Sequence, residues 1–361
     1  MVDAAKGWGF FQVVNHGIHK EVFEMMFCED KKLFDRSFNE KVREKFSDSS
    51  KNCYRWGNPN ATSPAQYSFS EAFHITLAEI SSYSNEGNNF RTTIAMYVQE
   101  IARVAQMICE ILGNQVNVNS KYFENIYALQ NSFLRLNKYH PCVFGSRMFG
   151  LVPHTDTSFI TILSQDQIGG LELKKNGQWI GVKPYSEALT VNIGDMFQAL
   201  SNGVYQSVRH RVIPPANVER FSIAFFVCPY HETEIECFGH PKKYRRFSFR
   251  EYKEQSERDV KETGDKEVSE SGFPFLDFHR YMRLSTSFFS FDVIHSSHYS
   301  LASYSSWQAN LELSLSCVQT QLTPYTELEE KELMHFLEKA VQEKKVAAEE
   351  FCQRKVHKLK A

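Results

Sequence analysis

The hydrophobic positions in the first third of the chain recur mostly at helical spacing. Apolar side chains repeat every three or four residues over residues 22–34, and a longer stripe of the same period runs over residues 94–112. Between these segments, residues 48–70 are rich in Ser, Asn and Pro, which predicts a loop. Residues 8–14 predict a short strand that has no earlier strand to pair with. We therefore expect residues 1–125 to form a helical N-terminal region.

The period of the pattern changes from that of a helix to that of a strand in the middle of the chain. Over residues 126–272, short alternating runs are separated by turn-forming residues at regular intervals, which predicts a β sandwich or barrel. The clearest hairpin joins residues 171–175 to residues 178–182 through Asn176-Gly177, the dipeptide favoured by type I′ turns. The expected fold class is mainly β with flanking α helices.

The end of the chain follows a third pattern. Residues 285–306 are rich in Ser, Phe, His and Tyr and show no clean period. Residues 326–360 instead carry one apolar stripe, and their other face holds acidic and basic side chains together. We expect residues 273–361 to be a C-terminal extension with a solvated helix at 326–360.

Composition and charge exclude several classes of protein. A chain of 361 residues that is 42% hydrophobic is neither disordered nor collagen-like. Its formal net charge of -2 gives no overall field to attract nucleic acid, and its longest apolar run, residues 221–228, is too short to span a membrane. The cysteines are scattered and the first residues lack an apolar secretion signal. We expect a cytoplasmic protein, with the nucleus as the alternative.

One histidine–carboxylate pair could hold a metal ion. In His154-Thr-Asp156 the two side chains project from the same face of an extended strand. A second histidine from a distant strand would complete a two-His, one-carboxylate set, which leaves coordination positions open as in non-haem Fe(II) oxygenases. His210 lies 54 residues after Asp156, which leaves room for about four short strands. Taken singly, the pair also fits a capped turn, and His210 also fits a packed core residue.

A cationic pair follows the second histidine. Arg220 and Ser222 share one face of the next strand-like run, and a guanidinium beside a hydroxyl suits the distal carboxylate of a dicarboxylic co-substrate. The alternative is a structural salt bridge, because Arg-x-Ser also occurs at residues 246–248 and 283–285. The chain has no Gly-x-Ser-x-Gly elbow, His-Glu-x-x-His motif or Gly-rich phosphate loop.

Taken together, these motifs resemble those of the plant 2-oxoglutarate- and Fe(II)-dependent dioxygenases. The resemblance covers about residues 5–266 and rests on motifs in the order of that family, at residues 8–17, 137–142, 154–156, 169–171, 192–195, 210–212 and 220–222. That family normally begins some tens of residues earlier, with a strand that pairs into the core. The resemblance therefore implies a truncated N-terminal region, and residues 273–361 match nothing in the family.

The resemblance implies a fold, a set of cofactors and a set of site residues. The fold is a double-stranded β-helix, also called a jelly-roll barrel. The implied iron ligands are His154, Asp156 and His210, and the implied co-substrate residues are Arg220, Ser222, Tyr139 and Asn137. The implied chemistry uses Fe(II), 2-oxoglutarate and O2, with ascorbate as reductant, and converts 2-oxoglutarate to succinate while a small molecule is hydroxylated.

Within the family, the chain most resembles the gibberellin 2-oxidases of the branch that acts on twenty-carbon gibberellins. Residues 54–57, 70–75, 161–167 and 205–210 carry this resemblance. It implies 2β hydroxylation of a gibberellin, with Tyr54, Arg55 and Trp56 on the substrate side and Arg55 as the partner of a substrate carboxylate. Two alternatives are the same chemistry on a flavonoid or another hormone, and a destabilised barrel without catalysis.

Overall fold

The computed structural model describes most of the chain up to Thr263. The described residues are 1–46, 53–58, 61, 66–81, 89–118, 122–123, 131–142 and 148–263. They fall within the first of the two units into which the chain divides, Met1–Asp277. The helix expected at 326–360, and the extension at 273–361 as a whole, lie outside the described residues.

The described helices and strands alternate along the chain. The helices are α1 (Val2–Trp8), α2 (Lys20–Phe34), α3 (Phe38–Arg43), α4 (Leu77–Ser81), α5 (Asn89–Asn114), α7 (Asp195–Leu200) and α8 (Phe249–Thr263). The strands are β1 (Phe10–Val13), β2 (Tyr54–Trp56), β3 (Ser70–Thr76), β4 (Phe133–Tyr139), β5 (Leu151–His154), β6 (Ile160–Gln165), β7 (Leu171–Lys175), β8 (Gln178–Gly181), β9 (Leu189–Ile193), β10 (His210–Val212), β11 (Arg220–Val227), β12 (Glu234–Ile235) and β13 (Phe247–Ser248).

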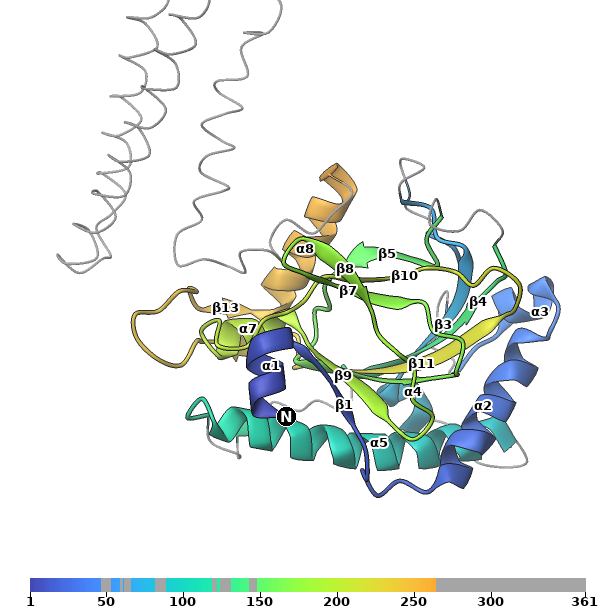
Figure 1. Ribbon diagram of the computed structural model, residues 1–361, viewed down its shortest axis with the longest axis horizontal. Coiled ribbons are helices and arrows are strands. Elements are labelled where there is room, and N and C mark those ends of the chain that lie inside the picture. The colour runs from blue at the N-terminus through green and yellow to red at the C-terminus, as the bar shows by residue number, and fades with distance from the viewer. Residues whose placement is uncertain are drawn as a thin grey trace, which may run out of the picture. The chain divides into compact units, whose positions relative to one another are not determined.

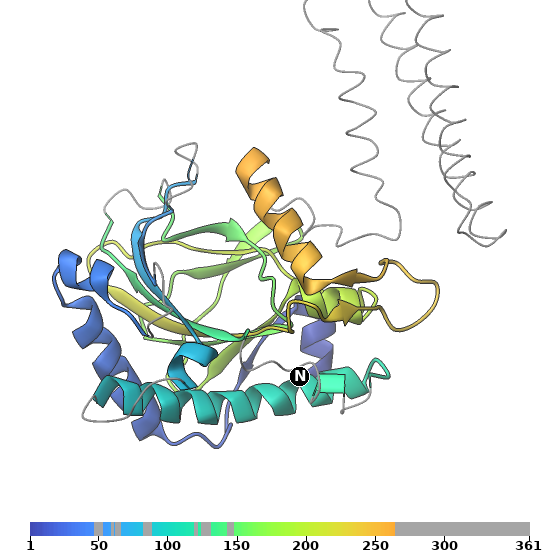
Figure 2. The same ribbon diagram turned by 180° about the vertical axis from the view of Figure 1, so that it is seen from behind.

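Two antiparallel sheets face each other and form the barrel (Figures 1 and 2). The larger sheet has the order β1-β9-β6-β11-β4-β3-β2, and the smaller one has the order β5-β10-β7-β8. Consecutive strands such as β5 and β6 lie in different sheets, so the chain passes repeatedly from one wall to the other. This topology confirms the expected mainly β fold, a double-stranded β-helix with flanking helices.

Helices cover the outer face of the larger sheet. Figure 1 shows α5 running beneath that sheet, with α2 beside it. The apolar stripe of α5 is buried, and the Tyr97 hydroxyl lies 2.7 Å from Ser164 Oγ on β6. Strand β11 alternates accordingly, because Phe221, Ile223 and Phe225 belong to the main hydrophobic core on the helix side. The intervening residues of β11 are therefore free to face the interior of the barrel.

The predicted hairpin is confirmed within one residue. Strands β7 and β8 pair antiparallel, with Lys175 opposite Gln178. Asn176 and Gly177 both have positive φ, 50° and 79°, as a type I′ turn requires. The second strand ends at Gly181, one residue before the predicted end.

The first third of the chain differs from the prediction at two places. Residues up to Trp8 are helical, and β1 has a later partner, since Phe10 pairs with Asn192 on β9. The expected loop at 48–70 contains β2, which pairs with β3 and forms the other edge of the larger sheet. The strand predicted over residues 8–14 is thus present as β1, whereas local composition misses β2 because that strand is fixed by its pairing with β3.

A buried polar cluster fixes β2 against β3. Glu71 on β3 accepts hydrogen bonds from Tyr54 Oη (2.6 Å) and from Lys41 Nζ, and its other oxygen lies 2.8 Å from His140 Nε2. Burial alone would raise the pKa of Glu71, but the hydrogen bonds of these three partners lower it to about 2. The cluster therefore holds a carboxylate, which ties α3 and β2 to the sheet.

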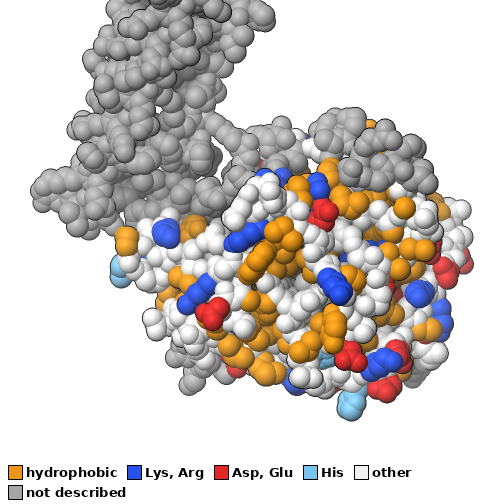
Figure 3. All heavy atoms as spheres, viewed as in Figure 1, with side chains coloured by type: hydrophobic (Ala, Val, Ile, Leu, Met, Phe, Trp, Pro, Cys, Tyr) orange, Lys and Arg blue, Asp and Glu red, His pale blue; other side chains and the backbone are white. Residues whose placement is uncertain are grey.

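The outer surface bears charges of both signs. On the face that Figure 3 shows, Lys and Arg side chains lie apart from one another, among apolar and acidic ones. In the described part of the chain, no helix is long and apolar enough to cross a membrane.

We expect Glu71→Gln to destabilise the barrel by about 3 kcal/mol at neutral pH, because it leaves Lys41 buried without its carboxylate. Urea unfolding measures the loss. A carboxyl with a lowered folded-state pKa stabilises above its unfolded value of 4.5 and loses that effect as the pH falls toward 2. The difference between the two proteins should therefore shrink in acid.

The matched control is Glu100→Gln, which removes an exposed ion pair with Arg103 and should change stability by less than about 1 kcal/mol. Equal stability of Glu71→Gln and the parent protein at neutral pH would show that the cluster does not hold β2.

Candidate metal centre and co-substrate pocket

Two histidines lie opposite each other on neighbouring strands of the smaller sheet. His154 ends β5, and His210 begins β10 directly opposite it in the antiparallel register. Each Nδ1 lies near the carbonyl oxygen two residues earlier, His154 near Val152 (2.8 Å) and His210 near Val208 (3.0 Å). A ring that donates its Nδ1 proton to a carbonyl keeps the Nε2 lone pair for a metal ion. Both rings are thus oriented as metal ligands before any metal binds.

Asp156 completes the group. Its Oδ2 accepts hydrogen bonds from Asn192 Nδ2 (2.7 Å) and Thr161 Oγ1 (2.6 Å). Its Oδ1 faces the histidines, 3.4 Å from His154 Nε2 and 3.7 Å from His210 Nε2. One ligand atom from each of the three residues lies within 4.8 Å of the others. Two nitrogens and one oxygen therefore converge on one point.

The carboxylate is kept ionised although it is buried. Burial would raise the pKa of Asp156, but its interactions with His210 and His154 and the hydrogen bond from Thr161 outweigh burial and hold that pKa well below its usual range. Strand β5 ends at His154, so Asp156 lies just beyond the strand on which the sequence places it. The backbone N–H of Asp195 donates a hydrogen bond to the backbone carbonyl of Asp156 (2.8 Å), which fixes the segment that follows β5.

The predicted co-substrate residues lie together on β11 and β4. Arg220 pairs with Tyr139 and Ser222 with Asn137 in the antiparallel register. Arg220 is fully buried, its guanidinium carbon lies 4.7 Å from the centre of the Tyr139 ring, and its Nη2 donates to Gln165 Oε1 (2.8 Å). The Nε of Arg220 has no hydrogen-bond partner. No carboxylate among the described residues lies within ion-pair distance of it.

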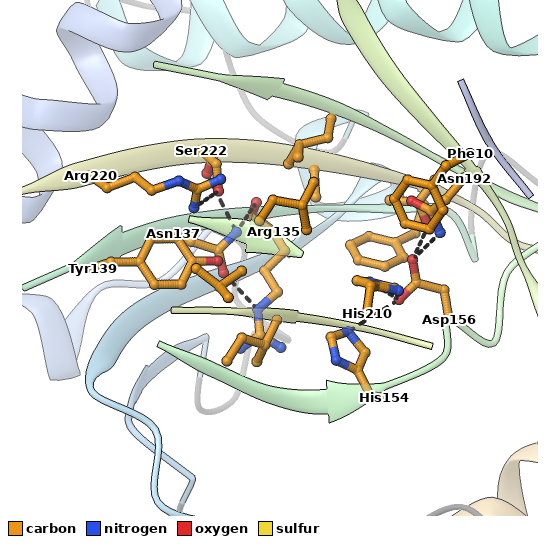
Figure 4. Close-up of a pocket in the computed structure, with 17 residues that line it drawn as sticks. Phe10, Arg135, Asn137, Tyr139, His154, Asp156, Asn192, His210, Arg220 and Ser222 are labelled. Atoms are coloured by element: carbon orange, nitrogen blue, oxygen red, sulfur yellow. Dashed lines mark hydrogen bonds and ion pairs between the residues drawn. The ribbon is translucent and has the colours of Figure 1, made fainter. Parts of the chain in front are cut away.

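One cavity contains both groups. In Figure 4, Arg220, Ser222 and Tyr139 lie toward one end, and the metal-binding candidates His154, Asp156 and His210 lie toward the other. A buried cation without a counter-ion is costly unless a ligand supplies the anion. The residues present therefore fit a dicarboxylate at the Arg220 end and a divalent metal ion at the His/Asp end. The donor set of two imidazoles and one carboxylate is that of non-haem Fe(II) sites.

Among the lining residues that have no role in the sequence prediction, four contact a predicted site residue. Asn192 and Thr161 hold Asp156, and their sequence signal is that they lie in the family-like segments 192–195 and 161–167. Phe10 places its ring edge-on against His210, with ring centres 5.4 Å apart. Arg135 lies two residues before Asn137 on β4, so strand alternation could have placed it in the cavity.

The predicted substrate residues lie elsewhere. Tyr54, Arg55 and Trp56 are not among the residues that line the cavity. The Tyr54 hydroxyl is bound to Glu71 in the buried cluster. Arg55 is exposed, and the Trp56 ring is exposed and lies 4.8 Å from the His140 ring. The structure thus brings the seven predicted metal and co-substrate residues together and leaves this segment outside the cavity.

Two family models match the chain. The 2OG-Fe(II) oxygenase superfamily matches residues 130–229, and the N-terminal region of non-haem dioxygenases in morphine synthesis matches residues 1–93. The chain is 80% identical over 252 residues to gibberellin 2-beta-dioxygenase 7 of Arabidopsis thaliana, which covers 70% of this chain and 75% of that protein. It is 42% identical over 263 residues to gibberellin 2-beta-dioxygenase 6 of rice (Oryza sativa subsp. japonica), covering 70% and 72%.

Solved structures agree with these matches. The crystal structure of JOX2 in complex with 2OG, Fe and JA has a TM-score of 0.61 and 31% identity, covering 70% of this chain and 78% of that one. A dioxygenase for auxin oxidation from rice has a TM-score of 0.61 and 25% identity, covering 74% and 90%. The chain therefore belongs to the 2-oxoglutarate- and Fe(II)-dependent oxygenase superfamily, and within it resembles the gibberellin 2-beta-dioxygenases.

Proposed function

We propose that this enzyme hydroxylates a gibberellin at the 2β carbon and thereby inactivates the hormone. One oxygen atom of O2 enters the gibberellin, and the other enters 2-oxoglutarate, which is decarboxylated to succinate and CO2. The observation that carries the proposal is the 80% identity over 252 residues to an Arabidopsis gibberellin 2-beta-dioxygenase. Fe(II), when bound, supplies the O2 chemistry, and ascorbate keeps it reduced.

Within this proposal, the metal ligands are His154 Nε2, His210 Nε2 and Asp156 Oδ1. The support is geometric, since these atoms converge on one point while the other ring nitrogen or carboxylate oxygen of each side chain is held by a neighbouring group. Three protein ligands leave coordination positions open for 2-oxoglutarate and O2.

Arg220 and Ser222 are proposed to hold the distal carboxylate of 2-oxoglutarate. A fully buried guanidinium beside a hydroxyl binds a carboxylate through charge-assisted hydrogen bonds. Tyr139 packs against the guanidinium. Asn137 lies two residues before Tyr139 on the same face of β4, between Tyr139 and the other cavity arginine, Arg135.

For the substrate side, Arg55 and Trp56 are proposed as contacts at the rim because both are exposed. Tyr54 is proposed to act indirectly, by holding β2 through Glu71.

The product of the reaction tests the proposed function. The protein is incubated with Fe(II), 2-oxoglutarate, ascorbate, O2 and gibberellins of both carbon skeletons, and the products are identified by mass spectrometry. We expect one added oxygen on a gibberellin and one succinate per product. Asp156→Ala should abolish both because it removes a ligand atom.

Two outcomes would contradict the proposal at different levels. Succinate without a hydroxylated gibberellin would keep the oxygenase chemistry and assign it to another plant small molecule, such as a flavonoid or another hormone. No succinate from folded protein would indicate a barrel without catalysis.

We expect Asn192→Ala to weaken Fe(II) binding about 10- to 100-fold, because groups that orient a metal ligand typically contribute that much. Anaerobic titration of Fe(II) into the apoprotein measures the dissociation constant. Asn114→Ala, at the exposed end of α5, is the matched control and should bind Fe(II) like the parent protein. Unchanged affinity in a folded Asn192→Ala protein would remove Asn192 from the support of Asp156.

We also propose a cytoplasmic location, with the nucleus as the alternative. The support is that Cys28, Cys109, Cys142, Cys228 and Cys237 form no disulfide, as is usual in a reducing compartment. A fluorescent fusion expressed in plant cells should fill the cytosol, and accumulation in the secretory pathway would contradict this.

A further inference from the structure

The cavity contains a second arginine. Along β4, the alternate residues Tyr139, Asn137 and Arg135 line it, and the Ala224 side of β11 lies opposite Arg135. Arg220 pairs with Tyr139, so Arg135 lies four residues farther along the barrel, roughly 13 Å at the spacing of an antiparallel strand. Figure 4 shows Arg135 between the Arg220 end and His154. The two guanidinium groups therefore line different parts of the cavity along the direction of β4.

Arg135 has no direct ion pair among the described residues, and Asp156 acts on its charge only at longer range. Its Nε donates to Asn137 Oδ1 (2.9 Å), and its two Nη groups donate to none of the described residues. No Asp or Glu in the described part of the chain lies within ion-pair distance of it. Burial lowers the pKa of Arg135, but a guanidinium stays protonated in proteins. An unpaired, half-buried cation indicates a site for an anion that comes from outside the chain.

Asn137 orients this guanidinium. The amide nitrogen of Asn137 donates to the Arg135 carbonyl (3.2 Å) and to the Ser222 carbonyl (3.4 Å), so its oxygen is turned toward Arg135 Nε. The free edge of the guanidinium then presents the paired Nη groups, which match the two oxygens of a carboxylate.

The surroundings of Arg135 are positive and apolar. Burial and the charges of Arg135 and Arg55 lower the pKa of His74 to about 4, so His74 is neutral near pH 7 and offers no competing cation. The rest of the cavity wall is largely apolar and is formed by Phe10, Leu151, Leu163, Leu171, Val212, Ala224 and Phe226. A cation in an apolar wall suits an acid with a hydrophobic body.

We propose that Arg135 is a specificity-determining residue that binds a carboxylate of the substrate. The inference rests on the proposed function and deepens it, because it names the residue that recognises the carboxylate of the substrate. Arg220 serves the co-substrate, and Arg135 serves the substrate. This assignment replaces Arg55 as the principal carboxylate partner, since Arg55 lies outside the cavity.

The test compares a gibberellin with its fully methylated ester in the intact protein. We expect the parent enzyme to bind and hydroxylate the free acid better than the ester. Arg135→Met should raise the KM for the acid roughly 10- to 100-fold, the loss expected for charge-assisted hydrogen bonds. It should abolish the preference for acid over ester and leave the KM for 2-oxoglutarate unchanged. Arg135→Lys should restore part of the preference.

Equilibrium dialysis under argon, with Fe(II) and 2-oxoglutarate present, gives the same comparison without turnover. Arg220→Met should have the opposite effect: it should raise the KM for 2-oxoglutarate and keep the preference for acid over ester. Arg103→Met, an exposed arginine on α5, should behave like the parent protein. Thermal melting shows that each variant is folded.

Three results would overturn the inference. The first is a parent enzyme that does not distinguish acid from ester, which needs no variant. The second is an Arg135→Met protein that keeps the preference. The third is an Arg135→Met protein whose defect lies in the KM for 2-oxoglutarate, which would make Arg135 a co-substrate residue. Failure of the proposed function looks different, because the parent enzyme would then hydroxylate neither form of the gibberellin.

Discussion

The buried carboxylate of Asp156 is the group on which the site depends. Asn192 and Thr161 bind one of its oxygens, and this leaves the other to face the two histidines. Asn192 is also the residue that pairs with Phe10 of β1. The N-terminal region thus makes two contacts with the metal site: β1 pairs with the strand that carries Asn192, and the Phe10 ring packs against His210. Strand β1 is therefore part of what positions the metal site.

The sequence predicts the part of the site that depends on strand alternation. The spacing between Asp156 and His210 predicts about four short strands between them. The structure has four there, β6, β7, β8 and β9. The sequence does not predict what depends on distant pairing. β2 is short and flanked by polar residues, and only its register with β3 makes it a strand. Arg135 lies two residues before the family motif at residues 137–142. That it has no direct ion pair among the described residues is known only from the structure.

The cavity contains two arginines, for which we propose different ligands. Arg220 is fully enclosed at a fixed end, which suits a co-substrate of constant length. Arg135 is only half-buried and has an apolar wall beside it, which suits a larger ligand. A guanidinium left without a counter-ion weakens the empty protein and strengthens the complex, so both arginines favour the loaded state. The same wall with another residue at position 135 would keep the chemistry and change the acid that is accepted.

The most direct test is an anaerobic crystal structure with Fe(II) and 2-oxoglutarate. Electron density should place one metal ion on His154 Nε2, Asp156 Oδ1 and His210 Nε2, and a carboxylate of 2-oxoglutarate on Arg220. Asp156 Oδ2 should keep its hydrogen bonds from Asn192 and Thr161. A metal ion bound through Oδ2, or 2-oxoglutarate away from Arg220, would contradict this account of the site.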